Sequence, residues 1–312
     1  MVETPGARTS HQLTTPEEVL MGLRDTLHTA LHSRTVLVLG VALTLAIPLV
    51  TLPRLPAVAV WPVALGLLPW VVGKYVLCPL RWRALTDADL GRWWHLRAYA
   101  ESELLGLLTP GHVGADLWRL RRLSRAGLDR GAAVVSVGMD RVVGAIGLAV
   151  FVGFAGTALP LHLLLPVLGL LVVGTVMLVV VRKVRPQWLP ERPPLPTPRR
   201  LALGLLLSAG YQLSIAALLL GTVAATGHTL DPLSILGAFG ASQLAGAVPG
   251  PNGASPRDAA LVVALAALGL PLVAAVAAVA IKAAIAWLPA LTLGGISLLL
   301  TRRSHRAQLL PG

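Results

Sequence analysis

Several runs of about 18 or more apolar residues divide this chain, and a run of that length crosses the hydrocarbon core of a bilayer as an α-helix. Only helices and closed barrels satisfy their backbone polar groups in lipid, and these runs lack the period-two alternation of barrel strands. Charged residues make up only 13% of the 312 residues, too few to cover a soluble domain of this length. We therefore predict an all-α polytopic membrane protein with six full spans, at residues 35–52, 57–79, 132–158, 160–181, 201–226 and 271–300.

The first 34 residues are polar and do not have the pattern of a signal peptide. The sequence Thr15-Pro16-Glu17-Glu18 is typical of a helix start, and leucines then recur at helical spacing. We predict an amphipathic helix over 16–33 that lies on the membrane surface, with a partly disordered leader as the alternative. The predicted organisation is a cytoplasmic leader, one membrane domain in two halves and a basic cytoplasmic tail, at residues 1–34, 35–301 (halves 35–158 and 160–301) and 302–312.

The basic residues are concentrated in a few connections, which matters more than the net charge of +12. Of the 26 Lys and Arg residues, 17 fall in the loops 81–92, 119–130 and 182–200 and in the tail. The positive-inside rule places these segments in the cytoplasm, so both termini are predicted to be cytoplasmic and the protein to reside in the cell membrane. Nucleic-acid binding is a poor interpretation, because no basic soluble domain is present.

Two partly apolar segments, residues 95–126 and 233–269, each contain a Pro-Gly-x-x-Gly-Ala hexapeptide. The positive-inside rule puts both ends of the first segment inside, and the same reasoning puts both ends of the second outside. Each segment is therefore predicted to enter the membrane and return as a re-entrant helical hairpin, which gives an inverted repeat. Proline ends a helical arm and glycine allows the turn, so the predicted tips are Pro110, Gly111, Gly114, Pro249, Gly250 and Gly253. A chance match is the alternative, because 31 Gly and 24 Pro make short matches common.

Charged residues inside the predicted spans are the first candidates for a site. Asp140 and Arg141 lie within 132–158, and Lys282 lies in the corresponding span of the second half. Intramembrane charges are costly, and cations close to two hairpin tips would suit an anionic group such as a lipid phosphate. The alternative is structural: Asp140 and Arg141 pair with other buried charges and lock helices together.

Further charges follow the two tips. Arg119 and Arg121 could guide a phosphate head group, although a basic loop that touches anionic lipids is an equal interpretation of this region. Arg257 follows the second tip and could bind substrate or pair with Asp258.

Three charged residues lie on the first arm of the first hairpin. Arg97 and Glu101 are four residues apart, which favours a stabilising pair on one helix face. Glu103 has no such local partner and is a candidate proton site.

Several chemistries are not indicated. The His residues have no metal-ligand spacing, there is no phosphate-binding loop, and the single Cys78 excludes a disulfide within the chain. We expect no cofactor, no metal and no catalytic residues.

Two long segments resemble signatures of a known family. LLTPGHVGADLWRLRRLSRAGLDRGAAVVSVGMDRVVGAIGL and AGAVPGPNGASPRDAALVVALAALGLPLVAAVAAVAIKAAIAWLPALTLGGISLL are similar to the paired signatures of the lysylphosphatidylglycerol synthase transmembrane-region family. The resemblance covers residues 35–301 and implies a flippase-like membrane protein without the aminoacyl-transferase domain. The chain departs from the family at Arg257-Asp258-Ala259, where Glu-Ala is usual, and at Lys282, where Arg is frequent.

Three functions follow as hypotheses. The first is a flippase-like protein that binds and translocates an anionic or polyprenyl-phosphate lipid. The second is a non-transporting scaffold or accessory protein whose partner is a membrane enzyme of lipid or glycan synthesis. The third, a membrane glycosyltransferase, is disfavoured because the predicted outer connections are short.

Overall fold

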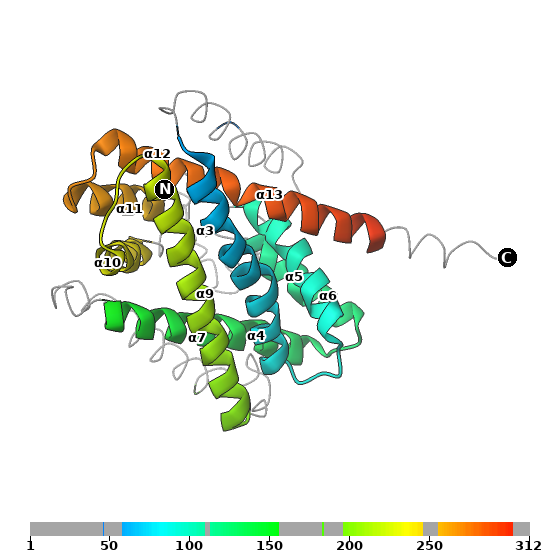
Figure 1. Cartoon of the computed structure of the whole chain (residues 1–312). Helices are drawn as coiled ribbons and strands as arrows, with labels where there is room; N and C mark the ends of the chain where they lie inside the picture. Colours follow the sequence, from blue (N-terminus) through cyan, green and yellow to red (C-terminus); the bar gives the residue numbers. More distant parts are fainter. Residues whose placement is uncertain are drawn as a thin grey trace, which may run out of the picture.

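The computed structural model describes residues 58–109, 113–155, 196–245 and 255–301, together with Ala46 and Lys183 (Figure 1). Every regular element in these ranges is helical, as predicted. The predicted spans 35–52 and 160–181, the predicted surface helix and the basic tail lie outside the described residues, apart from the single residue Ala46.

Four helical segments are long and apolar enough to cross a membrane. They are Val60–Leu85, Arg130–Phe151, Pro198–Ala225 and Leu272–Thr301. They match four of the six predicted spans, so the described part of the chain is that of a multi-pass helical membrane protein.

The first of these segments is longer than its apolar run predicted. Helix α3 (Val60–Val72) continues through a π-helix, η2 (Gly73–Leu77), into α4 (Cys78–Leu85). The predicted span ended at residue 79, because the sequence turns polar there. Arg81, which we had assigned to a cytoplasmic loop, is therefore a helical residue and is only 6% exposed.

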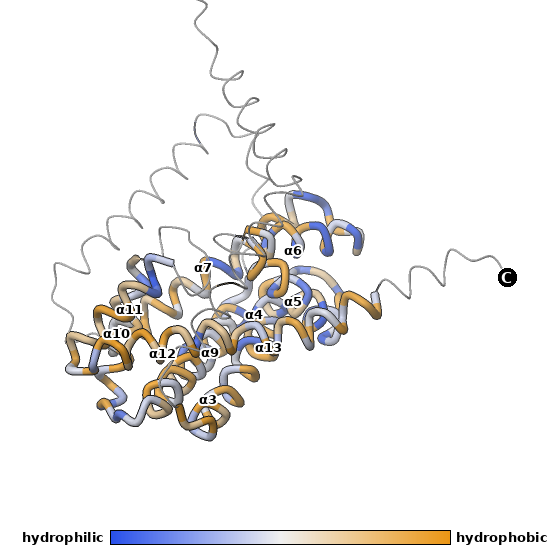
Figure 2. The backbone as a smooth tube through the Cα atoms, turned by 90° about the horizontal axis from the view of Figure 1, so that it is seen from above, coloured by the Kyte–Doolittle hydropathy of each residue, from blue (hydrophilic) through white to orange (hydrophobic). Residues whose placement is uncertain are grey.

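Each partly apolar segment contains two helices, as predicted. The first pair is α5 (Arg92–Leu107) and α6 (Val113–Arg125), and the second is α10 (Pro232–Leu244) and α11 (Pro256–Ala267). The two pairs lie on opposite sides of the molecule in both views of the backbone (Figures 1 and 2). Of the predicted tip residues, only Gly114 is described; its N–H donates to Thr109 Oγ1 at 2.9 Å. A side chain there would collide with the same hydroxyl, so this turn requires glycine.

The helices of the second half begin with local capping signals. Thr197, Asp231 and Ser255 each accept a hydrogen bond from a backbone N–H of the first turn of α9 (Pro198–Ala225), α10 and α11. Proline follows each cap at the first helical position, where its missing N–H costs nothing. These caps are local signals for where each helix starts.

The last span changes helix type near its middle. It runs through α12 (Leu272–Ile285), α13 (Trp287–Pro289) and a second π-helix, η6 (Ala290–Gly294), and stays helical to Thr301. The change follows Pro289, where the sequence predicted an interruption.

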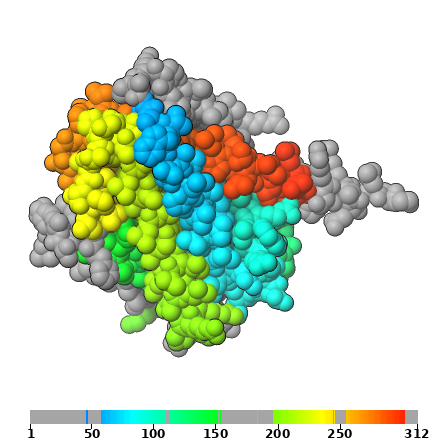
Figure 3. All heavy atoms as spheres, viewed as in Figure 1, coloured from blue at the N-terminus to red at the C-terminus, as the bar shows by residue number. Residues whose placement is uncertain are grey.

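Helices α3 and α9 form the centre of the described structure and run side by side across one face (Figure 3). Their backbones meet at two glycines. A Cβ atom on Gly66 would lie 2.6 Å from the carbonyl oxygen of Ala217, and one on Gly221 would collide with the carbonyl oxygen of Pro62. Small residues of this kind permit close helix packing within a membrane.

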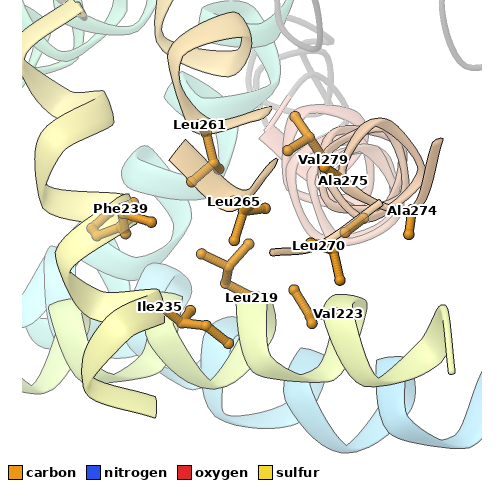
Figure 4. Close-up of a cluster of buried hydrophobic side chains, with 12 residues drawn as sticks. Leu219, Val223, Ile235, Phe239, Leu261, Leu265, Leu270, Ala274, Ala275 and Val279 are labelled. Carbon is orange, nitrogen blue, oxygen red and sulfur yellow. The ribbon is translucent and has the colours of Figure 1, made fainter. Parts of the chain in front are cut away.

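The largest apolar cluster joins α9 to the second helix pair and α12 (Figure 4). Leu219, Ile235, Leu261 and Leu265 are fully buried in it, and Phe239 is 4% exposed. A smaller cluster around Trp82 and Tyr99 lies beside the first pair. Helix α7 (Arg130–Ala155) packs against α9, α10 and α6, and so connects the two sides.

Candidate functional site

A cavity of about 420 Å³ opens between the central helices and both helix pairs. Its wall combines residues from α5, α7, α9, α10, α11 and α12 with residues from the continuous helix 60–85. Seven of the lining side chains are charged. Two are carboxylates, Glu103 and Asp140, and five are cationic: Lys74, Arg81, Arg141, Arg257 and Lys282. Residues that are far apart in the sequence therefore meet at one polar cavity within an apolar protein.

A continuous series of ion pairs runs along one side of this cavity. Lys74 Nζ lies 2.8 Å from Glu103 Oε2, and Glu103 Oε1 lies 3.4 Å from Arg119 Nη2. Arg119 Nη1 lies 3.1 Å from Asp140 Oδ2, and Asp140 Oδ1 lies 2.7 Å from Arg81 Nε. We call these five residues the charge chain. It connects four elements, namely the helix 60–85, α5, α6 and α7.

The charge chain is buried and well supplied with hydrogen bonds. Asp140 and Arg119 are each 1% exposed. Arg119 Nε donates to Ser102 Oγ at 3.2 Å, and its guanidinium lies 4.1 Å from the centre of the Tyr99 ring. Arg81 Nη1 donates to Ser208 Oγ at 3.3 Å. Buried charges are tolerated only with such partners, so separating these residues would cost free energy. The charge chain therefore holds the first helix pair against the neighbouring spans.

Arg141 points to a different partner from that of its neighbour Asp140. Its Nη2 lies 2.8 Å from Asp116 Oδ1 of α6, and its side chain is 49% exposed. Asp140 therefore fits the structural interpretation of a buried lock, whereas Arg141 combines an accessible side chain with a place on the cavity wall.

Lys282 of α12 also lines the cavity, and its Nζ lies 3.2 Å from Asp258 Oδ1 of α11. Asp258 also forms a capping box with Ser255. The suggested pair of Arg257 and Asp258 is thus wrong, because the carboxylate turns toward Lys282 and its own helix start. Arg257 forms no ion pair or hydrogen bond with the described residues, although it lines the cavity.

Two other sequence interpretations need correction. Arg97 does not pair with Glu101; it donates to Ser297 and Thr301 of the last span. Glu101 accepts from the same two hydroxyls at 2.8 and 3.0 Å and from Trp118, and it pairs with Arg122 at 3.3 Å. Both residues therefore fasten α5 to its neighbours rather than to each other.

Arg119 and Arg121 were both predicted to guide a phosphate head group, but the structure places them in different environments. Arg119 is buried in the charge chain, so it cannot receive a head group at a surface. Arg121 is exposed on α6, with its guanidinium 6.0 Å from the Trp118 ring, and it does not line the cavity. Asp140, Arg141, Arg257 and Lys282 do line it, and their binding role stays a prediction. Glu103 lines it too, and its role as a proton site also stays a prediction.

The comparison with known families agrees with the resemblance seen in the sequence. A family model described as the lysylphosphatidylglycerol synthase transmembrane region matches residues 36–294. The chain belongs to this family. The matching model describes the membrane region of the synthase, and no transferase domain is found beside it. No curated protein and no solved structure matches the chain.

Most residues that line the cavity of this family member were not predicted from the sequence, and three of them are polar groups that bear on its chemistry. Lys74 interrupts an apolar run, which is the sequence signal for a functional charge within the membrane. Arg81 was predicted to lie in the loop 81–92. Gln212 of α9 is 4% exposed and lines the cavity, and its Oε1 atom has no hydrogen-bond partner among the described residues.

The described residues contain no group of three His, Cys, Asp or Glu side chains that could hold a metal ion. The cavity wall offers instead guanidinium, ammonium, amide and phenol groups, which recognise anionic oxygens.

Proposed function

We propose that this family member is a flippase-like protein that binds and translocates an anionic, phosphate-bearing lipid. One observation carries the proposal: the cavity of about 420 Å³ collects cationic side chains from both halves of the sequence. Cations inside a membrane domain are costly, and an anionic substrate group compensates for that cost.

The proposed roles follow from position. Arg141 and Lys282, one from each half, hold the phosphate together with Arg257. The charge chain positions α5 and α6 beside the bound group. Arg121, which is exposed outside the cavity, attracts anionic head groups to the protein surface.

The proposed architecture has six spans and two opposed re-entrant hairpins in an inverted repeat, with both termini cytoplasmic. In such repeats the substrate site lies where the halves meet, and access alternates between the two sides. Two features support this arrangement here: the helix pairs lie on opposite sides of the molecule, and α6, α7, α11 and α12 all bring charges to the site (Figure 1).

The experiment is a fluorophore-quenching assay in liposomes that contain the full chain and acyl-labelled phosphatidylglycerol or phosphatidate. We expect protein-dependent transfer of at least one of these lipids between leaflets. Arg257→Gln should slow it about tenfold, since one charge-assisted contact is lost. Arg83→Gln, at an exposed position of α4, should not change the rate. Failure to translocate any anionic lipid would contradict the proposal.

The alternative is a non-transporting scaffold or accessory protein for a membrane enzyme of lipid or glycan synthesis. The buried charge chain favours it, because ion pairs of this kind can serve to specify one arrangement of helices. Under this alternative, neither the wild type nor Arg257→Gln would transfer lipid faster than protein-free liposomes, whereas loss of Asp140 would still destabilise the protein. The assay above therefore separates the two functions.

A further inference from the structure

The charges around the cavity do not balance. Four carboxylates belong to the cavity and its ion pairs: Glu103, Asp116, Asp140 and Asp258. Six cationic side chains face or pair with them: Lys74, Arg81, Arg119, Arg141, Arg257 and Lys282. Among the described residues, the site therefore has two more cations than carboxylates.

The excess has two sources. The charge chain contains three cations and two carboxylates, so it contributes one positive charge. Arg257 contributes the other, because it has no ion-pair partner in the described part of the chain while Asp258 is engaged by Lys282. Residues 110–112 and 246–254, which follow α5 and α10 in the sequence, contain no Asp, Glu, Lys or Arg.

The cavity wall also carries a side-chain amide whose oxygen has no hydrogen-bond partner among the described residues. Gln212 is 4% exposed, faces the cavity from α9, and leaves its Oε1 atom without a partner among the described residues. The O and N atoms of a Gln amide are interchangeable by a flip, so this group can also donate through its NH₂. A buried amide without a partner is costly unless a ligand supplies one.

Building on the proposed function, we propose that the cavity binds the doubly charged phosphate monoester of a lipid head group. A monoester brings two negative charges and three acceptor oxygens, which match the excess of two cations and the spare amide. A phosphodiester would leave one cation without compensation. A zwitterionic head group would leave two cations without compensation and would bring an ammonium group beside them.

The experiment is native mass spectrometry of the full chain in detergent with phosphatidate or phosphatidylglycerol of identical acyl chains. The second pKa of a phosphate monoester is roughly 6, so measurements at about pH 8 and about pH 5 compare its two charge states. We expect phosphatidate to be retained about tenfold better than phosphatidylglycerol at the higher pH, and the preference to vanish at the lower pH. Phosphatidylglycerol keeps one charge throughout and reports any change in the protein itself.

Variants connect this preference with the cavity. Arg257→Gln should remove most of the preference for phosphatidate, and Arg257→Lys should retain it because the charge is kept. Arg83→Gln, an exposed change outside the cavity, is the matched control and should behave like the wild type. A preference that persists in Arg257→Gln would overturn the proposal.

Two further outcomes separate this inference from the proposed function. Equal retention of the two lipids at both pH values would overturn the monoester inference, while lipid transfer in liposomes could still uphold transport. Inorganic phosphate is the third probe. If it displaces phosphatidate, the head group alone is recognised, which supports the inference. If it binds while no lipid is retained, a free phosphate rather than a lipid is the ligand, and the lipid proposal fails.

Discussion

The α5–α6 pair and the α10–α11 pair occupy opposite sides of the molecule, but different interactions fasten them. In the first pair, Glu101, Glu103 and Arg119 are buried and ion-paired, and they connect it with three neighbouring spans. In the second pair, the buried contacts are mainly leucine, isoleucine, phenylalanine and alanine side chains (Figure 4). Figure 2 shows the same contrast, with hydrophilic stretches along α6 and hydrophobic colour over most of α10.

This difference in contacts determines which pair can move at lower cost in free energy. Ion pairs need defined distances, and a displaced partner leaves a buried charge, so the first pair has one favoured position. Apolar contacts have no preferred direction, and a small displacement exchanges one contact for another. We therefore expect the second pair to be the more mobile side of the cavity.

The largest effect is expected from breaking the charge chain with Asp140→Asn. This change leaves the guanidinium groups of Arg81 and Arg119 buried without their carboxylate, which costs about 3–5 kcal/mol of unfolding free energy. Thermal unfolding in detergent measures the loss. Asp89→Asn, at an exposed position, is the control. A small loss of stability in Asp140→Asn would mean that these ion pairs do not hold the first helix pair in place.

On the apolar side, the corresponding test is Leu265→Ala, which creates a cavity in the apolar cluster around α9, α10 and α12. Leu265 is fully buried, so we expect a loss of about 3 kcal/mol by the same measurement. Val263→Ala, two positions away and 67% exposed, should change stability little. Equal effects at the two positions would contradict the assignment of the packing face.

A smaller effect is expected from Glu101→Gln, which removes the charge that Arg122, Ser297 and Thr301 share. The loss should be about 2 kcal/mol, with local consequences for the last span. Hydrogen exchange should increase in residues 290–301 and remain unchanged in α10. Uniform changes over the whole protein would show that Glu101 does not act through this contact.

The single described ion pair between α11 and α12 is a more direct comparison of the two sides. A double-mutant cycle with Asp258→Asn and Lys282→Gln should give a coupling energy of about 1 kcal/mol. The same cycle on Arg119 and Asp140 should give a clearly larger value, because these residues are more deeply buried. Similar couplings would remove the distinction between the pairs.

The smallest effect on stability is expected from Arg257→Gln. Arg257 has no ion pair or hydrogen bond in the described part of the chain, so the change should stay within about 0.5 kcal/mol. Its effect should appear in lipid retention instead. A large loss of stability without loss of binding would assign this residue to the fold.

The sequence predicted the helices better than their contacts. Apolar length identified the four described spans, and Pro-Gly breakers identified both helix pairs. The continuation of the first span to Leu85 was not predictable from hydropathy, because its last turns are polar. Their polar residues are buried by partners such as Asp140, which lies 59 positions from Arg81 in the sequence.

The sequence indicated some of the residues that line the candidate cavity, but not their ion-pair partners. Cations in apolar surroundings pointed to Arg141 and Lys282, and both lie on the cavity wall. One partner of Glu101, by contrast, is Ser297, which is 196 positions away, and no local spacing indicates that contact. Local rules predicted a pair with Arg97 instead, because they consider only one helix.

The contact of Gly66 with α9 has a mechanical consequence. Two backbones that touch cannot approach further, and a slide of one residue along either helix would bring a side chain into the contact. We therefore expect helices α3 and α9 to move as one unit. A distance measured across this contact should stay constant if the distances between the two helix pairs change.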